Sequence, residues 1–255
     1  MIRSIFKKAL MALTGLGLLG FLITHLAGNL LIYGGARHFN DYADMLERNP
    51  LLLPAEIGLL GLFIYHIFLA IKLTLENNKA RPIGYQDKKT AGESTLASRT
   101  MMLSGIVILI FVILHVRAFK YGENHLESKV GGVVYSQTVL WELVIKTFKD
   151  PLIAGWYVLA MIVMGFHLSH GTSSAFNSLG FLKPGWRKPL RRAGQIVGWA
   201  IALGFAAIPI YVQIAQPVVP DIPIPAPKIA ATPATATAGE NTQLVSANTE
   251  SGHSK

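Results

Sequence analysis

The stretch Thr100–Val116, TMMLSGIVILIFVILHV, contains no charged residue and a single histidine near its end. A helix needs roughly 17–25 mostly apolar residues to cross about 30 Å of hydrocarbon. Four further stretches are long enough and carry at most one charge; they run over Ala9–Ala36, Asn49–Ile71, Pro151–Leu182 and Ala193–Pro220. The sequence therefore predicts an all-α membrane protein with a bundle of five transmembrane helices.

The composition indicates lipid as the solvent around most of the chain. Of the 255 residues, 51% are hydrophobic and 15% are charged, whereas soluble domains carry about a quarter charged residues. The absence of cysteine excludes disulfides, cysteine-ligated iron–sulfur clusters, thiolate zinc sites and covalent haem attachment through C-x-x-C-H. The apolar run after Met1–Lys8 is too long for a cleaved signal peptide, so we expect the first helix to stay as an anchor.

Lysines and arginines gather on one side of the predicted membrane. Fourteen of the 23 lie in the N-terminus and in the second–third and fourth–fifth connections. By the positive-inside rule these segments are cytoplasmic, which predicts a cytoplasmic N-terminus and an external C-terminus. The net charge of +9 is then a sign of topology, and we expect no nucleic-acid site. We expect a membrane domain over residues 1–215 and a disordered external tail, rich in Pro, Ala and Thr, over residues 216–255.

One histidine lies in each of the first four spans: His25, His66, His115 and His167. An ionisable side chain in a membrane span is costly and is by default a functional candidate, although a neutral histidine bonded across helices is the alternative at any single position. At about 1.5 Å per residue, His25 and His115 lie about 20 Å along outward-running helices, and His66 and His167 about 20 Å along inward-running ones. The four therefore sort into an outer and an inner pair, and each pair can clamp one haem iron from both faces.

Other interpretations of these positions stay open. Zinc would need three or four ligands at one depth, usually with carboxylate or thiolate among them. The glycines near the histidines suit a porphyrin edge, but they also suit close helix packing. His170, three residues after His167, is a replacement ligand, a haem-propionate partner, a quinone-site donor or an ordinary interfacial histidine.

Three groups of motifs carry a resemblance to a known family. They are SRTMMLSG (Ser98–Gly105) with ILH (Ile113–His115), GFHLSHG (Gly165–Gly171) with FNSLG (Phe176–Gly180), and GWRKPLRRAG (Gly185–Gly194). With them, the chain resembles the cytochrome b membrane anchor of bacterial succinate dehydrogenases and fumarate reductases, in the single-subunit class with five helices and two haems.

The resemblance covers roughly residues 1–215 and implies two haem b groups, an outer one bound by His25 and His115 and an inner one bound by His66 and His167. It implies a flavoprotein with bound FAD and an iron–sulfur protein as partners at the bacterial cytoplasmic membrane. Electrons would pass between these partners and a quinone, with menaquinone as the expected type. The complex would interconvert succinate and fumarate, while this chain would not hold the dicarboxylate site; a higher oligomer of the complex is left open.

Quinone reduction takes up protons, so we expect an acid beside the quinone. In related chains an acid follows the first-helix ligand by a little over twenty positions, and Glu47 stands twenty-two after His25; the alternative for Glu47 is a solvated loop acid. Glu56 is a second candidate, although with Pro54 it also suits the first turn of a helix. The candidate partners of the haem propionates lie near the inner surface; they are Arg99, Lys183, Ser98, Ser169 and Thr100. The alternative for each of them is an ordinary interfacial anchor.

Two other classes of protein remain as alternatives. One is the dihaem cytochrome b anchor of a different membrane oxidoreductase, of the hydrogenase or formate dehydrogenase type. The other is a haem-free transporter or assembly factor. Some fumarate reductases of the family carry an acid two positions before the fourth-helix ligand, where this chain has Gly165, so the sequence does not predict that transmembrane proton path.

Overall fold

The computed structural model of the chain describes residues 2–79, 100–123, 125–130, 133–180 and 184–219. Within these ranges, five helices are long and apolar enough to cross a membrane; they are α1 (Ile2–Asn29), α3 (Leu52–Lys79), α5 (Met101–Phe119), α7 (Pro151–Ser178) and α8 (Arg187–Ala215). The predicted five-helix fold is confirmed, and the chain is a multi-pass membrane protein. The predicted external tail lies almost entirely outside the described residues.

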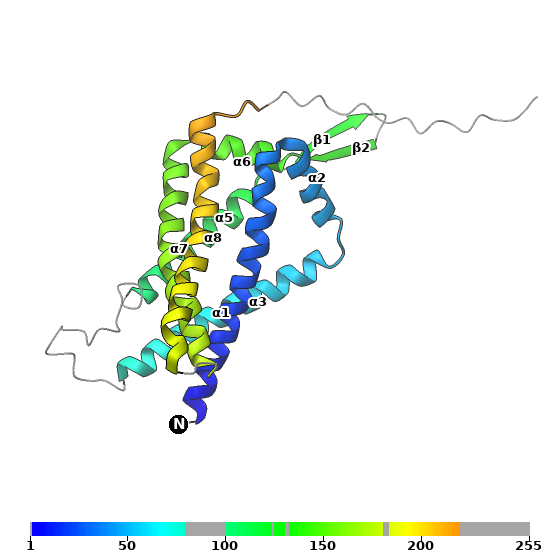
Figure 1. Cartoon of the computed structure of the whole chain (residues 1–255). Coiled ribbons are helices and arrows are strands. Elements are labelled where there is room, and N and C mark those ends of the chain that lie inside the picture. The colour runs from blue at the N-terminus through cyan, green and yellow to red at the C-terminus, as the bar shows by residue number, and fades with distance from the viewer. Residues whose placement is uncertain (1, 80–99, 124, 131–132, 181–183, 220–255) are drawn as a thin grey trace, which may run out of the picture.

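The five helices form an up-and-down bundle (Figure 1). α1, α5 and α8 run away from the end at which the chain begins, and α3 and α7 run back toward it. α7 and α8 pack together along most of their length, whereas α3 packs chiefly on α1 and is tilted across the bundle. The start of α1 and the end of α8 therefore lie at opposite ends of the bundle, while the side that faces the cytoplasm stays a prediction.

Three of the helices extend beyond the uncharged stretches that predicted them. α1 begins at Ile2, α3 continues to Lys79, and α8 begins at Arg187, directly after the short 3₁₀ turn η2 (Pro184–Trp186). Lys and Arg are good helix formers, and their long side chains carry the charge toward water while the backbone stays helical. A prediction from hydropathy alone therefore makes these helices too short at their charged ends.

The start of α7 is set by two local signals and falls where the sequence predicts it. Asp150 Oδ1 accepts hydrogen bonds from the backbone N–H groups of Leu152 at 2.8 Å and Ile153 at 3.3 Å. Pro151 occupies the first helical position, where the missing N–H of proline costs nothing. The N-cap residue Asp150 and the proline after it explain why this boundary was easier to predict than the others.

The connections at the end where α1 stops contain elements that the sequence did not predict. The 3₁₀ turn η1 (Leu30–Gly34) leads into helix α2 (Ala36–Glu47). Strands β1 (His125–Val130) and β2 (Val133–Thr138) form an antiparallel hairpin, which leads into helix α6 (Leu140–Lys149). We call α2 and α6 together the cap, because they close this end of the bundle (Figure 1).

The cap is held by a buried core and by polar contacts between its two helices. Ile145 of α6 is fully buried, and Trp141 donates its indole N–H to the backbone oxygen of Ile32 at 3.1 Å. Asn40 of α2 donates to the buried Glu142 carboxylate of α6 at 2.9 Å. These contacts fix the end of α1, and with it the helix that carries His25.

α7 and α8 approach closely because glycines of α8 lie in their interface. A Cβ on Gly198 would lie 2.6 Å from the backbone nitrogen of Ser169, and a Cβ on Gly194 would lie 3.1 Å from that of Ser173. The first of these distances leaves no room for a side chain. Small residues allow this kind of close backbone packing between membrane helices.

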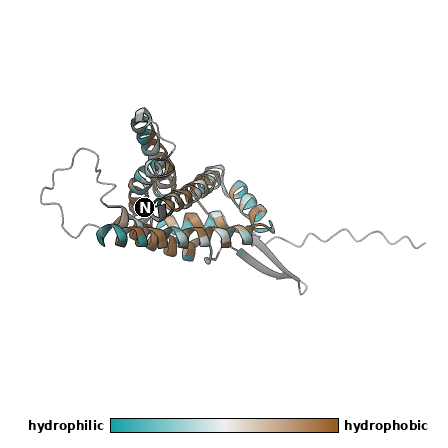
Figure 2. Cartoon of the chain, turned by 90° about the horizontal axis from the view of Figure 1, so that it is seen from below, coloured by the Kyte–Doolittle hydropathy of each residue, from teal (hydrophilic) through white to brown (hydrophobic). Residues whose placement is uncertain are grey.

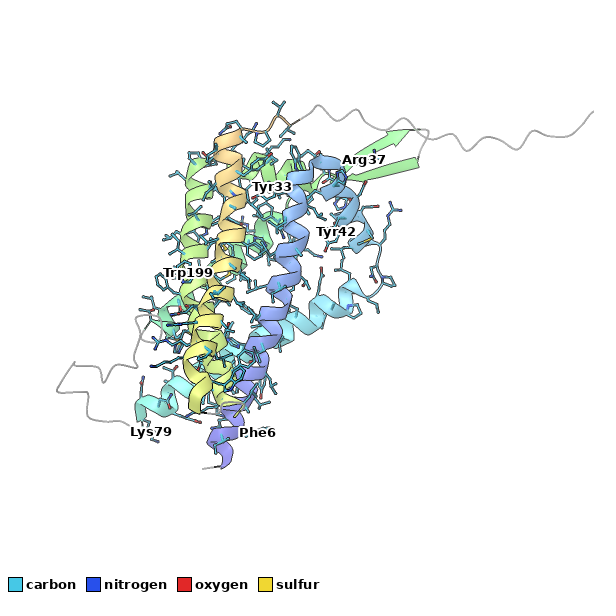
Figure 3. The ribbon with its side chains drawn as sticks, viewed as in Figure 1. Phe6, Tyr33, Arg37, Tyr42, Lys79 and Trp199 are labelled. Carbon is cyan, nitrogen blue, oxygen red and sulfur yellow. The ribbon has the colours of Figure 1, made fainter. Side chains whose placement is uncertain are left out.

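Hydrophobic residues run along the membrane helices (brown in Figure 2), and many of them are exposed. On α3, the side chains of Ile57, Ile64 and Phe68 are each more than half exposed. Figure 3 places Lys79 at the end where the chain begins and Arg37 at the opposite end. Apolar sides with basic residues at the ends are what a membrane-spanning bundle presents to lipid and water.

Candidate functional site

His25 of α1 and His115 of α5 lie together at one level of the bundle. Their ring centres are 5.9 Å apart, and their planes are nearly perpendicular, at 88°. Aromatic side chains of the same helices pack against them: Phe21 stacks on His25 at 5.1 Å, and Phe111 stacks on His115 at 5.5 Å. The structure thus brings together the two histidines that the sequence assigned to the outer pair.

Polar contacts to the outer pair are long. The Tyr157 hydroxyl lies 3.4 Å from His115 Nδ1, and the Asn29 side-chain nitrogen lies 3.4 Å from His25 Nε2. Donor and acceptor atoms in protein hydrogen bonds are usually about 2.7–3.2 Å apart. The packing of aromatic rings therefore positions this pair more than hydrogen bonding does.

His66 of α3 and His167 of α7 form the second group, and they are close enough to interact electrostatically. Each ring contacts a hydroxyl on a neighbouring helix. Thr14 Oγ1 of α1 lies 3.0 Å from His66 Nδ1, and Ser104 Oγ of α5 lies 2.9 Å from His167 Nδ1. Both hydroxyl-bearing residues are buried, each 5% exposed.

Thr14 and Ser104 contact the inner histidines and were not predicted from the sequence. A hydroxyl in a membrane helix most often bonds to its own backbone, so neither residue stands out. Their spacing is a signal that could have found them. Thr14 precedes His25 by eleven residues, and Ser104 precedes His115 by eleven, which is close to three helical turns and puts each hydroxyl on the same face as the histidine of its own helix.

His170 lies near the inner pair, on the turn of α7 that follows His167. It is close enough to His167 and to Arg191 of α8 to interact with both electrostatically. The structure therefore keeps His170 among the side chains that a group bound by the inner pair would meet, and it does not choose among the predicted roles.

The remaining residues predicted to meet haem propionates are only partly within the described structure. Ser169 is buried in the α7–α8 interface and donates its hydroxyl to the backbone oxygen of Phe166 at 3.0 Å. Thr100 directly precedes α5. Three predicted partners lie outside the described residues; they are Ser98, Arg99 and Lys183.

Glu47 is the last residue of α2, in the connection between α1 and α3, and its side chain is partly exposed. Its carboxylate accepts from the Nε2 atom of His125 at 3.0 Å and from the Thr138 hydroxyl at 3.4 Å. Both partners belong to the hairpin. The contacts of Glu47 thus join α2 to β1 and β2, because the unpredicted hairpin folds back over the end of α2.

Glu56 lies one residue beyond the first turn of α3, because that helix begins at Leu52 and not at Pro54. Its carboxylate bonds to the ammonium of Lys120, at the end of α5, at 2.5 Å. Glu56 also lines a mainly apolar groove of about 330 Å³ between α1 and α3. The other residues of the groove are Phe21, Leu52, Ala55, Gly58, Leu59 and Leu62.

The groove adjoins the outer pair through one shared side chain. Phe21 lines the groove and also stacks on His25. A flat ligand in the groove would therefore lie one aromatic ring away from the outer histidines. This arrangement is suited to electron exchange between a group bound at the outer pair and a ligand in the groove.

The histidines occur in twos. Within the ranges that the structure describes, no group of three or more His, Cys, Asp or Glu side chains lies where it could hold a metal ion by itself. Each pair could supply two nitrogen ligands to a metal ion whose other ligands come from a bound macrocycle.

Comparison with known proteins gives one curated relative. Over 175 residues, which are 66% of this chain and 77% of the relative, the chain is 26% identical to the succinate dehydrogenase cytochrome b558 subunit of Bacillus subtilis (strain 168). No protein-family model matches the chain, and no solved structure matches it. The resemblance to cytochrome b anchors that the motifs indicate is thereby confirmed, at modest identity.

Proposed function

We propose that this chain is the cytochrome b membrane anchor of a succinate:quinone oxidoreductase and carries electrons between an iron–sulfur subunit and a quinone through two b haems. The observation that carries the proposal is the arrangement of four histidines as two pairs within one membrane bundle. The similarity to the Bacillus subtilis subunit supports it.

The outer pair fits a haem iron in spacing. A transition metal lies about 2.0–2.1 Å from an imidazole nitrogen that binds it, and the ring centre lies about 1 Å further, so two rings on opposite sides of one iron have centres about 6 Å apart. The centres of His25 and His115 are 5.9 Å apart. When bound, the haems would supply one-electron transfer, which no amino-acid side chain of this site offers.

A buried donor gives a second sign of fit. The indole Nε1 of Trp156 is buried and has no hydrogen-bond partner among the described residues. A buried polar group of this kind calls for an acceptor, and a haem propionate provides one. Trp156 precedes His167 by eleven residues on α7, so it lies on the histidine face of that helix, about three turns from the inner pair.

The groove between α1 and α3 is our candidate for the quinone. Its volume of about 330 Å³ lies within the range of about 300–1,000 Å³ found for ligand sites. Its apolar walls suit the ring of an isoprenoid quinone such as menaquinone, and Glu56 supplies the acid that proton uptake requires. Glu47, the first candidate from the sequence, is the alternative for this role.

The end of the bundle at which α1 begins suits the docking of soluble partners. Its exposed basic residues include Lys8, Lys79, Lys188, Arg191 and Arg192. We propose that this end faces the cytoplasm of a bacterial cell and binds an iron–sulfur protein that is itself joined to an FAD-containing flavoprotein. The inner histidine pair would then lie nearer the incoming electrons, and the outer pair nearer the quinone.

Purification of the chain with its partners, followed by a reduced-minus-oxidised absorption spectrum, tests this proposal. We expect a b-type haem band, about two haems per chain, and copurification with a flavoprotein. Copurification with a molybdenum or nickel protein would instead indicate the anchor of a formate dehydrogenase or hydrogenase. The absence of any b-type band would contradict the haem proposal altogether.

A further inference from the structure

We propose that the hydroxyls of Thr14 and Ser104 fix the tautomer of the two inner histidines and thereby lower the reduction potential of the haem that these histidines would bind. This inference rests on the proposed function and adds two positioning residues to it. Neither residue is an iron ligand. Each acts through the ring that it contacts.

The direction of the hydrogen bond at His66 follows from a second contact of Thr14. Thr14 Oγ1 lies 3.0 Å from the backbone oxygen of Met11 and 3.0 Å from His66 Nδ1. A carbonyl oxygen only accepts, so the one hydroxyl proton of Thr14 is donated to Met11. The proton between Thr14 and His66 must then come from Nδ1, which leaves Nε2 of His66 with the free lone pair that a metal needs.

The same arrangement occurs at His167. Ser104 Oγ lies 3.0 Å from the backbone oxygen of Met101, three residues earlier on α5, and 2.9 Å from His167 Nδ1. The Ser104 proton therefore goes to Met101, and Nδ1 of His167 donates to the hydroxyl oxygen. Both inner histidines are thus held in the tautomer that presents an unprotonated Nε2.

A glycine follows each hydroxyl and lies in contact range of the ring of an inner histidine. A Cβ on Gly15 would lie 3.4 Å from Cε1 of His66, and a Cβ on Gly105 would lie 3.8 Å from Cε1 of His167. The sequence pair of a small hydroxyl residue followed by glycine therefore occurs on two helices and meets an inner histidine each time. Two independent occurrences argue against chance packing.

The eleven-residue spacing explains why only the inner pair has this support. α1 and α5 each carry an outer histidine and, eleven residues before it, a hydroxyl at the level of the inner pair. The positions eleven residues before His66 and His167 are Ala55 and Trp156, which carry no hydroxyl. The outer pair instead has the two contacts of 3.4 Å described above.

The hydrogen bonds to Nδ1 should change the reduction potential of the bound haem in a definite direction. An acceptor bonded to Nδ1–H of a ligating histidine raises the basicity of its Nε2. A more basic ligand stabilises oxidised iron over reduced iron, so it lowers the reduction potential. Loss of either hydroxyl should therefore raise the potential of the inner haem and leave that of the outer haem unchanged.

The test uses Thr14→Val and Ser104→Ala in the complete complex, with a redox titration of the haem spectrum. At a fixed ambient potential we expect the ratio of reduced to oxidised inner haem to rise about tenfold, which is an upward shift of about 59 mV for a one-electron couple. Thr24→Val is the matched control, because Thr24 is exposed on α1 and donates to the backbone oxygen of Phe21 at 2.9 Å.

Variants that keep a hydroxyl distinguish an effect on the reduction potential from an effect of lost side-chain packing. Thr14→Ser and Ser104→Thr should keep the parent potential, and if the Val or Ala variants lose the inner haem, these variants should retain it. Inner-haem potentials that stay at the parent value in Thr14→Val and Ser104→Ala would overturn the inference, as would Ser and Thr variants that behave like Val and Ala. A parent complex without two b haems would contradict the proposed function itself.

Discussion

The two histidine pairs differ in what surrounds their rings. His66 and His167 each have a close hydroxyl on a neighbouring helix. His25 and His115 are packed by aromatic rings, and their polar contacts are 3.4 Å long. The inner pair is thus oriented by hydrogen bonds that act at fixed angles, and the outer pair by packing, which allows small rotations. If each pair binds a haem as we propose, the two haems should differ in reduction potential.

Replacing one outer histidine should remove one haem and leave the other. In His115→Ala we expect the extracted haem to fall from about two to about one per chain, because an iron with a single axial histidine binds more weakly. The redox titration should then show a single one-electron component, that of the inner haem. His38→Ala serves as the control, since His38 is exposed and its Nδ1 contacts the backbone oxygen of Gly34. Two retained haems in His115→Ala would exclude His115 as a ligand.

His167→Ala should remove the inner haem and weaken assembly with the soluble subunits, as should His66→Ala. His170 complicates the first of these tests, because it lies within electrostatic reach of His167. The double variant His167→Ala/His170→Ala resolves the ambiguity. If the single variant keeps a two-haem spectrum and the double variant loses it, His170 has replaced the ligand; two haems in both variants would contradict the assignment of His167.

Glu56→Gln should lower quinone reduction on the order of 10²-fold, because an amide cannot transfer the proton that a positioned carboxyl transfers. The haem spectrum should stay unchanged, since the described contacts of Glu56 are with Lys120 and the groove and not with a histidine. The rate is measured with the complete complex and a soluble menaquinone analogue. Glu47→Gln is the comparison; a loss of activity there and not in Glu56→Gln would move the quinone site to Glu47.

The sequence predicted candidate site residues only where the residue type is energetically costly in a membrane helix. A histidine in an apolar span stands out, so His25, His66, His115 and His167 were singled out as candidates, and the structure brings His25 and His115 together. A threonine or serine in a helix does not stand out, so Thr14 and Ser104 were missed. The groove beside Glu56 depends on the packing of α1 against α3, which the sequence of either helix alone does not contain.

At the scale of elements, long apolar runs predicted the five membrane helices, while the cap and the hairpin were missed. α2 and α6 are short and carry both charged and apolar residues. A search for membrane spans therefore does not detect them. They become stable only when they bury residues such as Phe39 of α2 and Ile145 of α6 against the rest of the protein. Tertiary packing, and not helix propensity, accounts for these helices.

The α7–α8 interface predicts opposite effects for two glycine substitutions. Gly198→Ala should destabilise the chain by about 1–3 kcal/mol, because its Cβ would lie 2.6 Å from a backbone atom of α7. Gly171→Ala, on α7 itself, meets nothing within 4 Å and should be neutral or stabilising by up to about 1 kcal/mol, since alanine favours the helix. Thermal unfolding in detergent measures both. Equal effects of the two substitutions would contradict the close packing at Gly198.

At the scale of the whole molecule, the helices alternate in direction between the end at which the chain begins and the end that holds the cap (Figure 1). The two histidine pairs lie at two levels between these ends, because α1 and α5 each carry an outer histidine and, eleven residues before it, a hydroxyl that contacts an inner histidine. The direction of electron flow that we propose depends on which end faces the cytoplasm. The prediction that the basic end is inside rests on the distribution of Lys and Arg. It therefore needs a measurement that does not depend on charge.

The absence of native cysteine allows that measurement without background. We expect a membrane-impermeant maleimide to label Tyr121→Cys in intact spheroplasts, because Tyr121 is 79% exposed and follows the end of α5 near the cap. Lys79→Cys lies at the opposite end of the bundle (Figure 3) and should be labelled only after the membrane is permeabilised with detergent. Neither position belongs to the proposed haem or quinone sites, so both proteins should keep the parent haem spectrum. The reverse labelling pattern would place the cap in the cytoplasm, and His66 and His167 would then lie nearer the outside than His25 and His115.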